Sequence, residues 1–211
     1  MSQLTSLLLE IILLIGLPYY LMTSQTTILA ARPLLMGLGG FYCLLQLFRS
    51  RVTLPTLGLT RHNFSPALRS LALPSLLIVL AIYSLLALSS DSTRLWLIGS
   101  DPLSISNFAA RLAFYVFGSA TLQEFIFRGY LTWRLEKAQL SHTWLWILSV
   151  GIFTLLHLPF NSPIMSGVAL TLGILYLANF LRYRNLLAVS LSHALVGAGL
   201  IILRHFYLPY I

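Results

Sequence analysis

Long apolar stretches, separated by short polar connections, run along the whole chain. Most of them hold roughly the 20 residues that a helix needs to cross about 30 Å of hydrocarbon. Since backbone groups inside lipid must be satisfied within the segment itself, each stretch is expected to be a helix. The apolar segments cover residues 4–22, 27–48, 66–88, 105–135, 142–159, 164–182 and 185–206. This pattern predicts an all-α polytopic membrane helix bundle of about seven transmembrane helices, with residues 1–211 as a single membrane domain.

The composition strengthens this prediction. Hydrophobic residues make up 58% of the chain and charged residues only 9%, whereas about 25% of a soluble domain is charged. Charges this scarce cannot cover a water-facing surface, so membrane lipid is the expected environment. The net charge of +8 does not indicate a nucleic-acid partner, because the basic residues fall at segment ends and not on one face with stacking aromatics.

The basic residues also predict an orientation. Three connections carry them: Arg49, Arg51, Arg61 and Arg69, then Arg134 and Lys137, then Arg182 and Arg184. If every segment crosses once, these connections share one side, which the positive-inside rule places in the cytoplasm. We therefore expect a multi-pass protein with a cytoplasmic N-terminus, and the lack of an organelle-targeting segment suggests a bacterial plasma membrane. The basic residues that count against this orientation are Arg32, Arg94, Arg111 and Arg204.

The fourth segment contains polar residues at its centre, in the stretch TLQEFIFRGYLTWR (residues 121–134). An ionisable group inside a membrane segment costs about 2.5–3.5 kcal/mol or more, so it marks a functional hypothesis. Glu124 and Arg128 are four residues apart and share a helix face, which predicts an ion pair that neutralises both charges. Gln123 points about 100° away from Glu124 and is expected to face a different helix.

Two histidines lie within later segments. His157 ends the fifth segment and His193 lies inside the seventh. A single histidine of this kind is more often a hydrogen-bonded packing residue than a catalyst. With Glu124 and Arg128, however, the two histidines could converge from three helices on one polar cavity. No role is assigned to the histidines at segment ends, which are His62, His142 and His205.

A glutamate and two histidines support two kinds of chemistry. A partly desolvated carboxylate can act as general base on a water, while one imidazole orients that water and the other stabilises an oxyanion. That set serves amide hydrolysis without a cofactor. Alternatively, Glu124, His157 and His193 could bind zinc and leave a fourth position for water. The compact HExxH spacing is absent, so the zinc alternative rests on residue types alone.

The motifs resemble those of the CPBP (Abi) family, which contains CAAX-type prenyl-protein endopeptidases and bacteriocin-processing or self-immunity proteins. The resemblance rests on Gln123-Glu124-x-x-x-Arg128, Phe153-x-x-x-His157 and His193, in that order on separate segments. Phe127-Arg128-Gly129 and Leu57-Gly58-Leu59 are also similar to the family. The similarity covers roughly residues 57 to 200.

This resemblance implies an all-helical membrane fold with the site among the C-terminal four helices. It implies a glutamate-type intramembrane endopeptidase, formerly called a metalloprotease, that cleaves hydrophobic or prenylated peptide and protein substrates. In the family pattern the first glutamate (position 123) and the first histidine (His157) activate water. The last histidine (His193) and an Asn or Asp (position 197) stabilise the oxyanion. Glu124, Arg128 and Phe153 take supporting positions.

The chain departs from that pattern at two positions. Gln123 replaces the first glutamate and cannot accept a proton at neutral pH, and Gly197 replaces the Asn or Asp and has no side-chain donor. Four interpretations are open. The chain is a silent member that binds without cutting, Glu124 serves as the base, His157 activates water while Gln123 orients it, or position 123 carries a Glu-to-Gln trap substitution.

Three functions remain as hypotheses. The first is an intramembrane endopeptidase acting on hydrophobic peptides or protein tails. The second is a catalytically silent member that binds or shields such peptides. The third is a small transporter, which is disfavoured because the chain shows no repeated halves.

Overall fold

The computed structural model of the chain describes residues 3–24, 32–98 and 107–207. Over these ranges the chain consists of helices and short connections, with no strand. The predicted all-α class is therefore confirmed. The α-helices are α1 (Gln3–Ile11), α2 (Leu17–Ser24), α3 (Arg32–Arg49), α4 (Phe64–Leu88), α5 (Asp91–Ile98), α6 (Phe108–Phe114), α7 (Ala120–Glu124), α8 (Thr132–Lys137), α9 (His142–Leu155), α10 (Pro163–Tyr183) and α11 (Leu186–Tyr207).

Wider, π-helical turns join several of these helices into longer rods. Ile12–Gly16 joins α1 to α2, while Tyr115–Ser119 and Phe125–Leu131 join α6, α7 and α8. Residues 108–137 thus form one continuous helix with a π-helical stretch on each side of Glu124. Such stretches often occur at functional sites, because they shift the register of the side chains that follow.

Among the described residues, five helices are long and apolar enough to cross a membrane. They are Thr5–Thr23, Phe64–Leu88, His142–Phe160, Pro163–Tyr183 and Leu186–His205. Two of the seven predicted spans differ. For the span at 27–48, residues 27–31 lie outside the described residues and the apolar helix Pro33–Arg49 is shorter. For the span at 105–135, residues 105 and 106 also lie outside the described residues, and the continuous helix 108–137 contains several charged residues.

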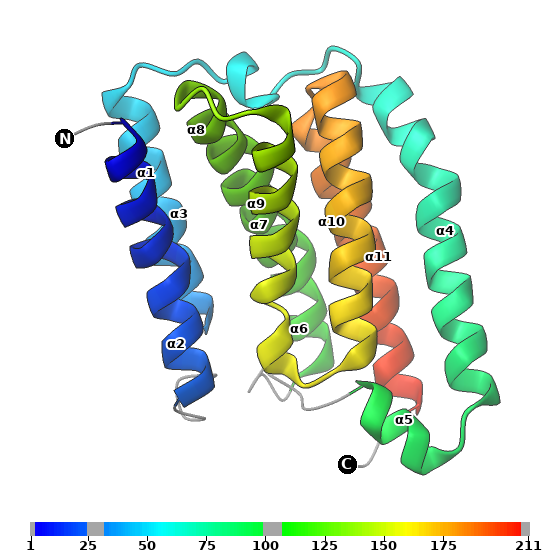
Figure 1. Ribbon diagram of the computed structural model, residues 1–211. Coiled ribbons are helices and arrows are strands. Elements are labelled where there is room, and N and C mark those ends of the chain that lie inside the picture. Colours follow the sequence, from blue (N-terminus) through cyan, green and yellow to red (C-terminus); the bar gives the residue numbers. More distant parts are fainter. Residues whose placement is uncertain (1–2, 25–31, 99–106, 208–211) are drawn as a thin grey trace.

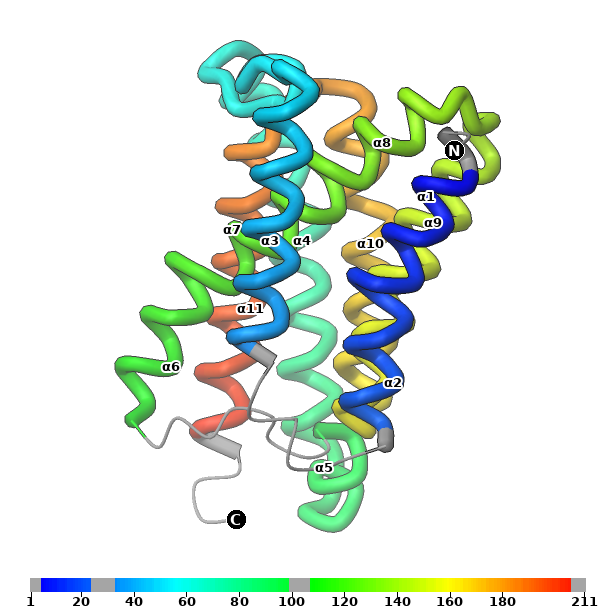
Figure 2. The backbone as a smooth tube through the Cα atoms, turned by 90° about the vertical axis from the view of Figure 1, so that its left-hand side faces the viewer, coloured from blue at the N-terminus to red at the C-terminus, as the bar shows by residue number. Residues whose placement is uncertain are grey.

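The helices stand side by side with the polar segment at the centre (Figure 1). α11 packs against α4 and α7, and α10 packs against α9 and α4. α3 covers α7 on the opposite side from α4, as both views show (Figures 1 and 2). The start of α1 and the end of α11 lie at opposite ends of the bundle (Figure 1).

Apolar side chains occupy both the interior and the outer surface of the bundle. Phe127, Phe153 and Leu177 are buried in the core, whereas Leu13, Leu77, Phe117 and Leu195 are among the large apolar side chains that are exposed on outer helices. A surface of this kind would be a liability in water, but it suits lipid. The structure is that of a multi-pass membrane protein.

The connection before α4 is attached to the turn between α10 and α11. Gly58 has a φ of +77°, and a Cβ there would lie 2.9 Å from the backbone oxygen of Arg184 and from the backbone nitrogen of Leu186. The Gly58 carbonyl accepts a hydrogen bond from the Leu186 amide at 2.8 Å. The Leu57-Gly58-Leu59 sequence therefore needs glycine, both for the left-handed backbone and for this close approach.

A buried ion pair holds α1 against α8. Both Glu10 carboxylate oxygens accept hydrogen bonds from Arg134, at 2.7 and 2.8 Å, and Tyr130 donates a third at 2.8 Å. The sequence analysis counted Arg134 only as a topology signal, although it is buried and paired. The partner Glu10 is 124 residues away, so no local spacing could have revealed the contact.

Candidate intramembrane active site

Glu124 lies at the centre of the polar site, at the end of α7. Its Oε1 is 3.1 Å from Nη1 of Arg128, and both side chains are 0% exposed. The structure thus contains the ion pair that the four-residue spacing predicts. Nη2 of Arg128 also donates to the Gly173 carbonyl on α10 at 3.3 Å. The guanidinium carbon lies 4.4 Å from the centre of the Phe153 ring.

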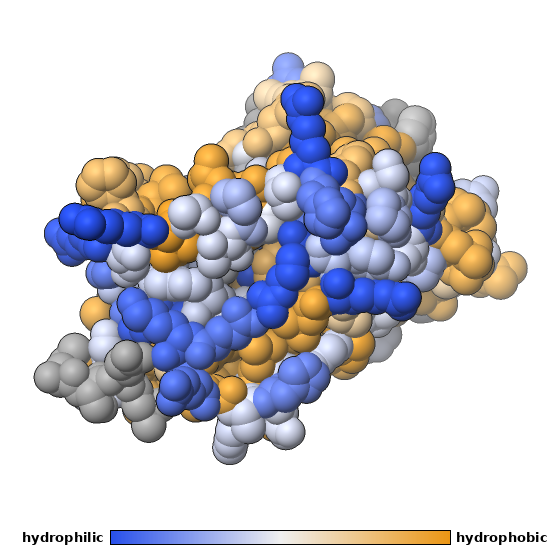
Figure 3. All heavy atoms as spheres, turned by 90° about the horizontal axis from the view of Figure 1, so that it is seen from above, coloured by the Kyte–Doolittle hydropathy of each residue, from blue (hydrophilic) through white to orange (hydrophobic). Residues whose placement is uncertain are grey.

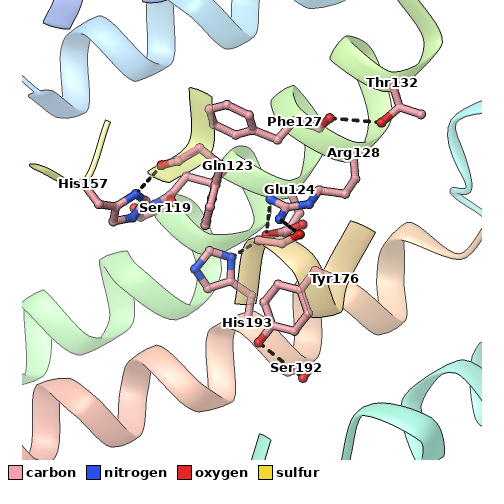
Figure 4. A network of polar contacts seen from close by, with 12 residues as sticks. Ser119, Gln123, Glu124, Phe127, Arg128, Thr132, His157, Tyr176, Ser192 and His193 are labelled. Atoms are coloured by element: carbon pink, nitrogen blue, oxygen red, sulfur yellow. Dashed lines mark hydrogen bonds and ion pairs between the residues drawn. The ribbon is translucent and has the colours of Figure 1, made fainter. Parts of the chain in front are cut away.

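His193 reaches the same carboxylate from α11. Its Nδ1 lies 2.6 Å from Oε1 of Glu124 (Figure 4). Because a carboxylate beside an arginine accepts hydrogen bonds, Nδ1 carries the hydrogen and the other ring nitrogen, Nε2, is available for other chemistry. Glu124 thus orients His193 in the way that a buried carboxylate orients the histidine of a catalytic triad.

Gln123 points in a different direction from Glu124. Its amide donates to Oγ of Ser119, one helical turn earlier, at 2.9 Å. The two neighbouring side chains therefore contact different groups, as the 100° rotation between successive helical residues predicts.

His157 follows the end of α9. Its Nδ1 lies 2.7 Å from the Phe153 carbonyl oxygen, and since a carbonyl oxygen only accepts, Nδ1 carries the hydrogen. In the neutral ring the basic nitrogen is then Nε2. The Phe153 ring lies between the two histidines, with its centre 4.8 Å from that of His157 and 5.9 Å from that of His193.

A cavity of about 290 Å³ opens beside these residues. Gln123, His157 and His193 line it, whereas Glu124 and Arg128 do not and lie behind His193. Most of the remaining wall is apolar and comes from both ends of the sequence. It includes Ile15, Met22, Met36, Ile82, Met165 and Leu172. A bound peptide would meet a few polar groups on a largely apolar surface, and Arg111 and Arg204 also border the cavity.

Gly197 lies one turn after His193 and also borders the cavity. A Cβ at this position would lie 2.1 Å from the hydroxyl oxygen of Tyr115. Sequence analysis missed Tyr115. Its position eight residues before Gln123 and four before Ser119 was a usable signal, because residues at these intervals share a helix face.

The predicted residues are not a zinc site in this arrangement. Within the described parts of the chain, no three His, Cys, Asp or Glu side chains lie close enough together to hold a metal ion. His157 and His193 direct Nδ1 to the Phe153 carbonyl and to Glu124 respectively, with the Phe153 ring between them. The residues therefore do not fit the ion.

The structure brings Glu124, Arg128, Phe153 and His193 into direct contact and places Gln123 and His157 in the wall of the adjoining cavity. The fold and site together define a multi-pass membrane protein with a polar site enclosed by its helices.

Comparison with known families agrees with this description. Residues 105–199 match the family described as type II CAAX prenyl endopeptidase Rce1-like. The match includes every residue of the polar site and confirms the resemblance to the CPBP (CAAX protease) family. It begins after Leu57-Gly58-Leu59, which the sequence analysis had included in the similarity. Neither a curated protein nor a solved structure matches the chain.

Proposed function

We propose that the chain is a CAAX-protease-like intramembrane endopeptidase that hydrolyses peptide bonds in hydrophobic or prenylated peptides and protein tails. The observation that carries this proposal is the arrangement of Gln123, His157 and His193 along one largely apolar cavity. Such a cavity can receive an apolar peptide and hold its backbone against neutral polar groups.

His157 is the proposed general base. Its Nε2 takes a proton from a water, and the water oxygen bonds to the carbonyl carbon of the scissile amide. The carbon–nitrogen bond then breaks, and the same proton passes to the leaving nitrogen as it becomes an amine. Gln123 orients the water through its amide. Glu124 is not proposed as the base, because it is fully buried behind His193 and already accepts from Arg128 and His193.

His193 is the proposed electrophilic group. When protonated, it donates from Nε2 to the oxygen of the tetrahedral intermediate, and Glu124 stabilises the imidazolium. Arg128 holds Glu124 in place through their ion pair. This ion pair lies behind the cavity wall.

A catalytically silent member that binds or shields membrane peptides is the second candidate. The observation in its favour is that none of the described residues lining the cavity is a carboxylate. In this reading the same cavity binds the peptide, and Gln123 leaves the water without a sufficiently strong base.

The orientation proposed from the sequence also has support. Exposed basic residues lie in the connections at the upper end of Figure 1, and Figure 3 shows hydrophilic side chains gathered on that face. They include Arg49, Arg51, Arg61, Lys137, Arg182 and Arg184. By the positive-inside rule this face is cytoplasmic, in a plasma membrane that we propose to be bacterial.

The test is a cleavage assay in liposomes with hydrophobic peptides, in prenylated and unprenylated forms. We expect slow cleavage by the unaltered chain and none by His157→Ala. His142→Ala is the matched control, because His142 is an exposed histidine at the other end of α9. Cleavage that survives His157→Ala would refute the role of His157. If peptides bind but neither the unaltered chain nor Gln123→Glu cuts them, the silent alternative replaces the enzyme.

A further inference from the structure

Tyr115 and Gly197 occupy one space between two helices. A Cβ on Gly197 would lie 2.1 Å from both the hydroxyl oxygen and Cε1 of Tyr115, and 2.2 Å from Cζ. Real side-chain atoms do not approach this closely, so no side chain fits at position 197 while the Tyr115 ring stays in place. The hydroxyl end of the ring therefore fills the volume in which a side chain on position 197 would begin.

This placement brings the hydroxyl next to His193. Position 197 is one helical turn after His193, on the same face of α11. The Tyr115 ring meets the His193 ring edge-on, with 6.1 Å between ring centres and 71° between planes. Both rings line the cavity, together with Gln123 and His157.

The hydroxyl is polar but makes no hydrogen bond to any part of the chain that the structure describes. Over residues 3–24, 32–98 and 107–207, the Tyr115 side chain makes the ring contact with His193 and no hydrogen bond. A tyrosine hydroxyl away from water usually finds a partner, because an unpaired polar group is costly there. At the cavity wall, a bound ligand can supply that partner.

A second tyrosine beside His193 shows the contrast. The Tyr176 ring centre lies 5.6 Å from that of His193, but Tyr176 is 0% exposed and does not line the cavity. Its hydroxyl oxygen lies 3.5 Å from Oγ of Ser192, which donates to it (Figure 4). Tyr176 therefore packs behind the histidine, whereas Tyr115 presents its hydroxyl to the space where a peptide would bind.

We infer that Tyr115 is a substrate-contacting residue whose hydroxyl donates a hydrogen bond to the carbonyl oxygen of the peptide bound beside His193. The inference rests on the proposed peptide-binding and cleaving function. Gly197 has no side chain, so α11 supplies no hydrogen-bond donor at this position. Tyr115, on the same helix as Gln123, supplies the donor instead. No proton is transferred: the phenol donates to the carbonyl oxygen and donates more strongly once that oxygen becomes negative. Glycine at 197 makes room for this donor.

The first experiment compares two ligands of identical sequence. One is the peptide with its scissile amide intact, and the other carries a phosphinate at that position, which imitates the tetrahedral intermediate. Tyr115→Phe keeps the ring and removes only the hydroxyl. We expect phosphinate affinity and kcat to fall on the order of 100-fold, while amide affinity and KM change by less than about tenfold, because a hydrogen bond to a neutral carbonyl is much weaker than one to an oxyanion. Tyr176→Phe, the matched control, should leave all four quantities unchanged.

A swap of the donor between helices gives a second test. Tyr115→Ala opens the space beside Gly197, and the additional change Gly197→Asn then places an amide donor in it. Relative to Tyr115→Ala alone, we expect the double variant to regain at least about tenfold in phosphinate affinity. If the double variant does not regain this affinity, side chains at positions 115 and 197 do not present a donor to the same point of the ligand, and the inference is overturned.

The outcomes separate this inference from the proposed function. Cleavage or phosphinate binding that is insensitive to Tyr115→Phe overturns the role of Tyr115 and leaves the enzyme intact. If neither the unaltered chain nor Gln123→Glu binds the amide peptide or the phosphinate, the proposed function fails and the inference fails with it.

Discussion

Replacing Arg128 by glutamine tests the central ion pair. The change removes the charge that faces Glu124 and leaves the fold around it in place. Glu124 is 0% exposed, and Arg128 and His193 are its hydrogen-bond partners among the described residues. Arg128→Gln therefore leaves a buried carboxylate supported by one imidazole.

The expected cost can be worked out from these contacts. Breaking a buried ion pair by removing one partner costs about 3–5 kcal/mol, because the remaining charge is no longer compensated. His193 still donates a hydrogen bond to the carboxylate, which favours the lower end of that range. The variant also loses the cation–π contact between Arg128 and Phe153. A desolvated contact of this kind contributes about 2 kcal/mol. We expect a net loss of about 5 kcal/mol.

The assay is reversible unfolding in mixed micelles, read as the free energy of unfolding. Glu124→Gln/Arg128→Gln is the matched control, because removing both charges leaves no uncompensated carboxylate. In a double-mutant cycle the double variant should be more stable than Arg128→Gln. A single variant that is as stable as the unaltered chain but inactive would refute the supporting role and assign Arg128 to substrate binding.

Three further predictions concern other parts of the chain. Gln123→Glu should raise the cleavage rate on the order of 100-fold, because it adds a carboxylate base at the cavity wall; an unchanged rate would show that position 123 does not face the reacting water. Glu10→Gln should lower the free energy of unfolding by about 3 kcal/mol, because it leaves Arg134 partly buried without its charged partner. Its control is Ser6→Ala, which removes a weaker hydrogen bond to the same carboxylate and should cost under about 1.5 kcal/mol. Gly58→Ala should cost about 2 kcal/mol or more in the same measurement, since alanine is strained at a φ of +77° and its Cβ would meet the Arg184 carbonyl; Gly37→Ala is its control, because nothing lies within 4 Å of a Cβ there.

The bundle could be predicted because lipid leaves few alternatives. A long apolar segment in a membrane must be helical, so hydropathy alone located the helices from 64 to 88 and from 163 to 207 to within a few residues. The helix from 108 to 137 was also placed, but its π-helical stretches, which contact α3, α9 and α11, were not predicted. Hydropathy indicates which segments are buried, but it does not indicate whether a helical turn is α-helical or π-helical.

Within the site, local contacts were predictable and long-range contacts were not. The pair of Glu124 and Arg128 follows from a four-residue spacing, as does the divergence of Gln123 from Glu124. The contact of Glu124 with His193 spans 69 residues, and that of Tyr115 with Gly197 joins two separate helices. Both depend on how α11 is rotated against α7, which a single sequence does not encode in any local pattern.

The distribution of charge explains how glutamine can stand at position 123 beside a polar network. An ionised side chain in the cavity wall would carry a large cost whenever a lipid-like peptide displaced water from it. In the wall, Gln123, His157 and Tyr115 offer hydrogen bonds without fixed charge, although Arg111 and Arg204 also border the cavity. The opposite charges of Glu124 and Arg128 compensate each other behind the wall. His193 alone connects the two layers, since it lines the cavity and bonds to Glu124. The same arrangement favours tight binding of a neutral peptide and, with imidazole in place of carboxylate as base, a slower hydrolysis than a wall containing glutamate would give.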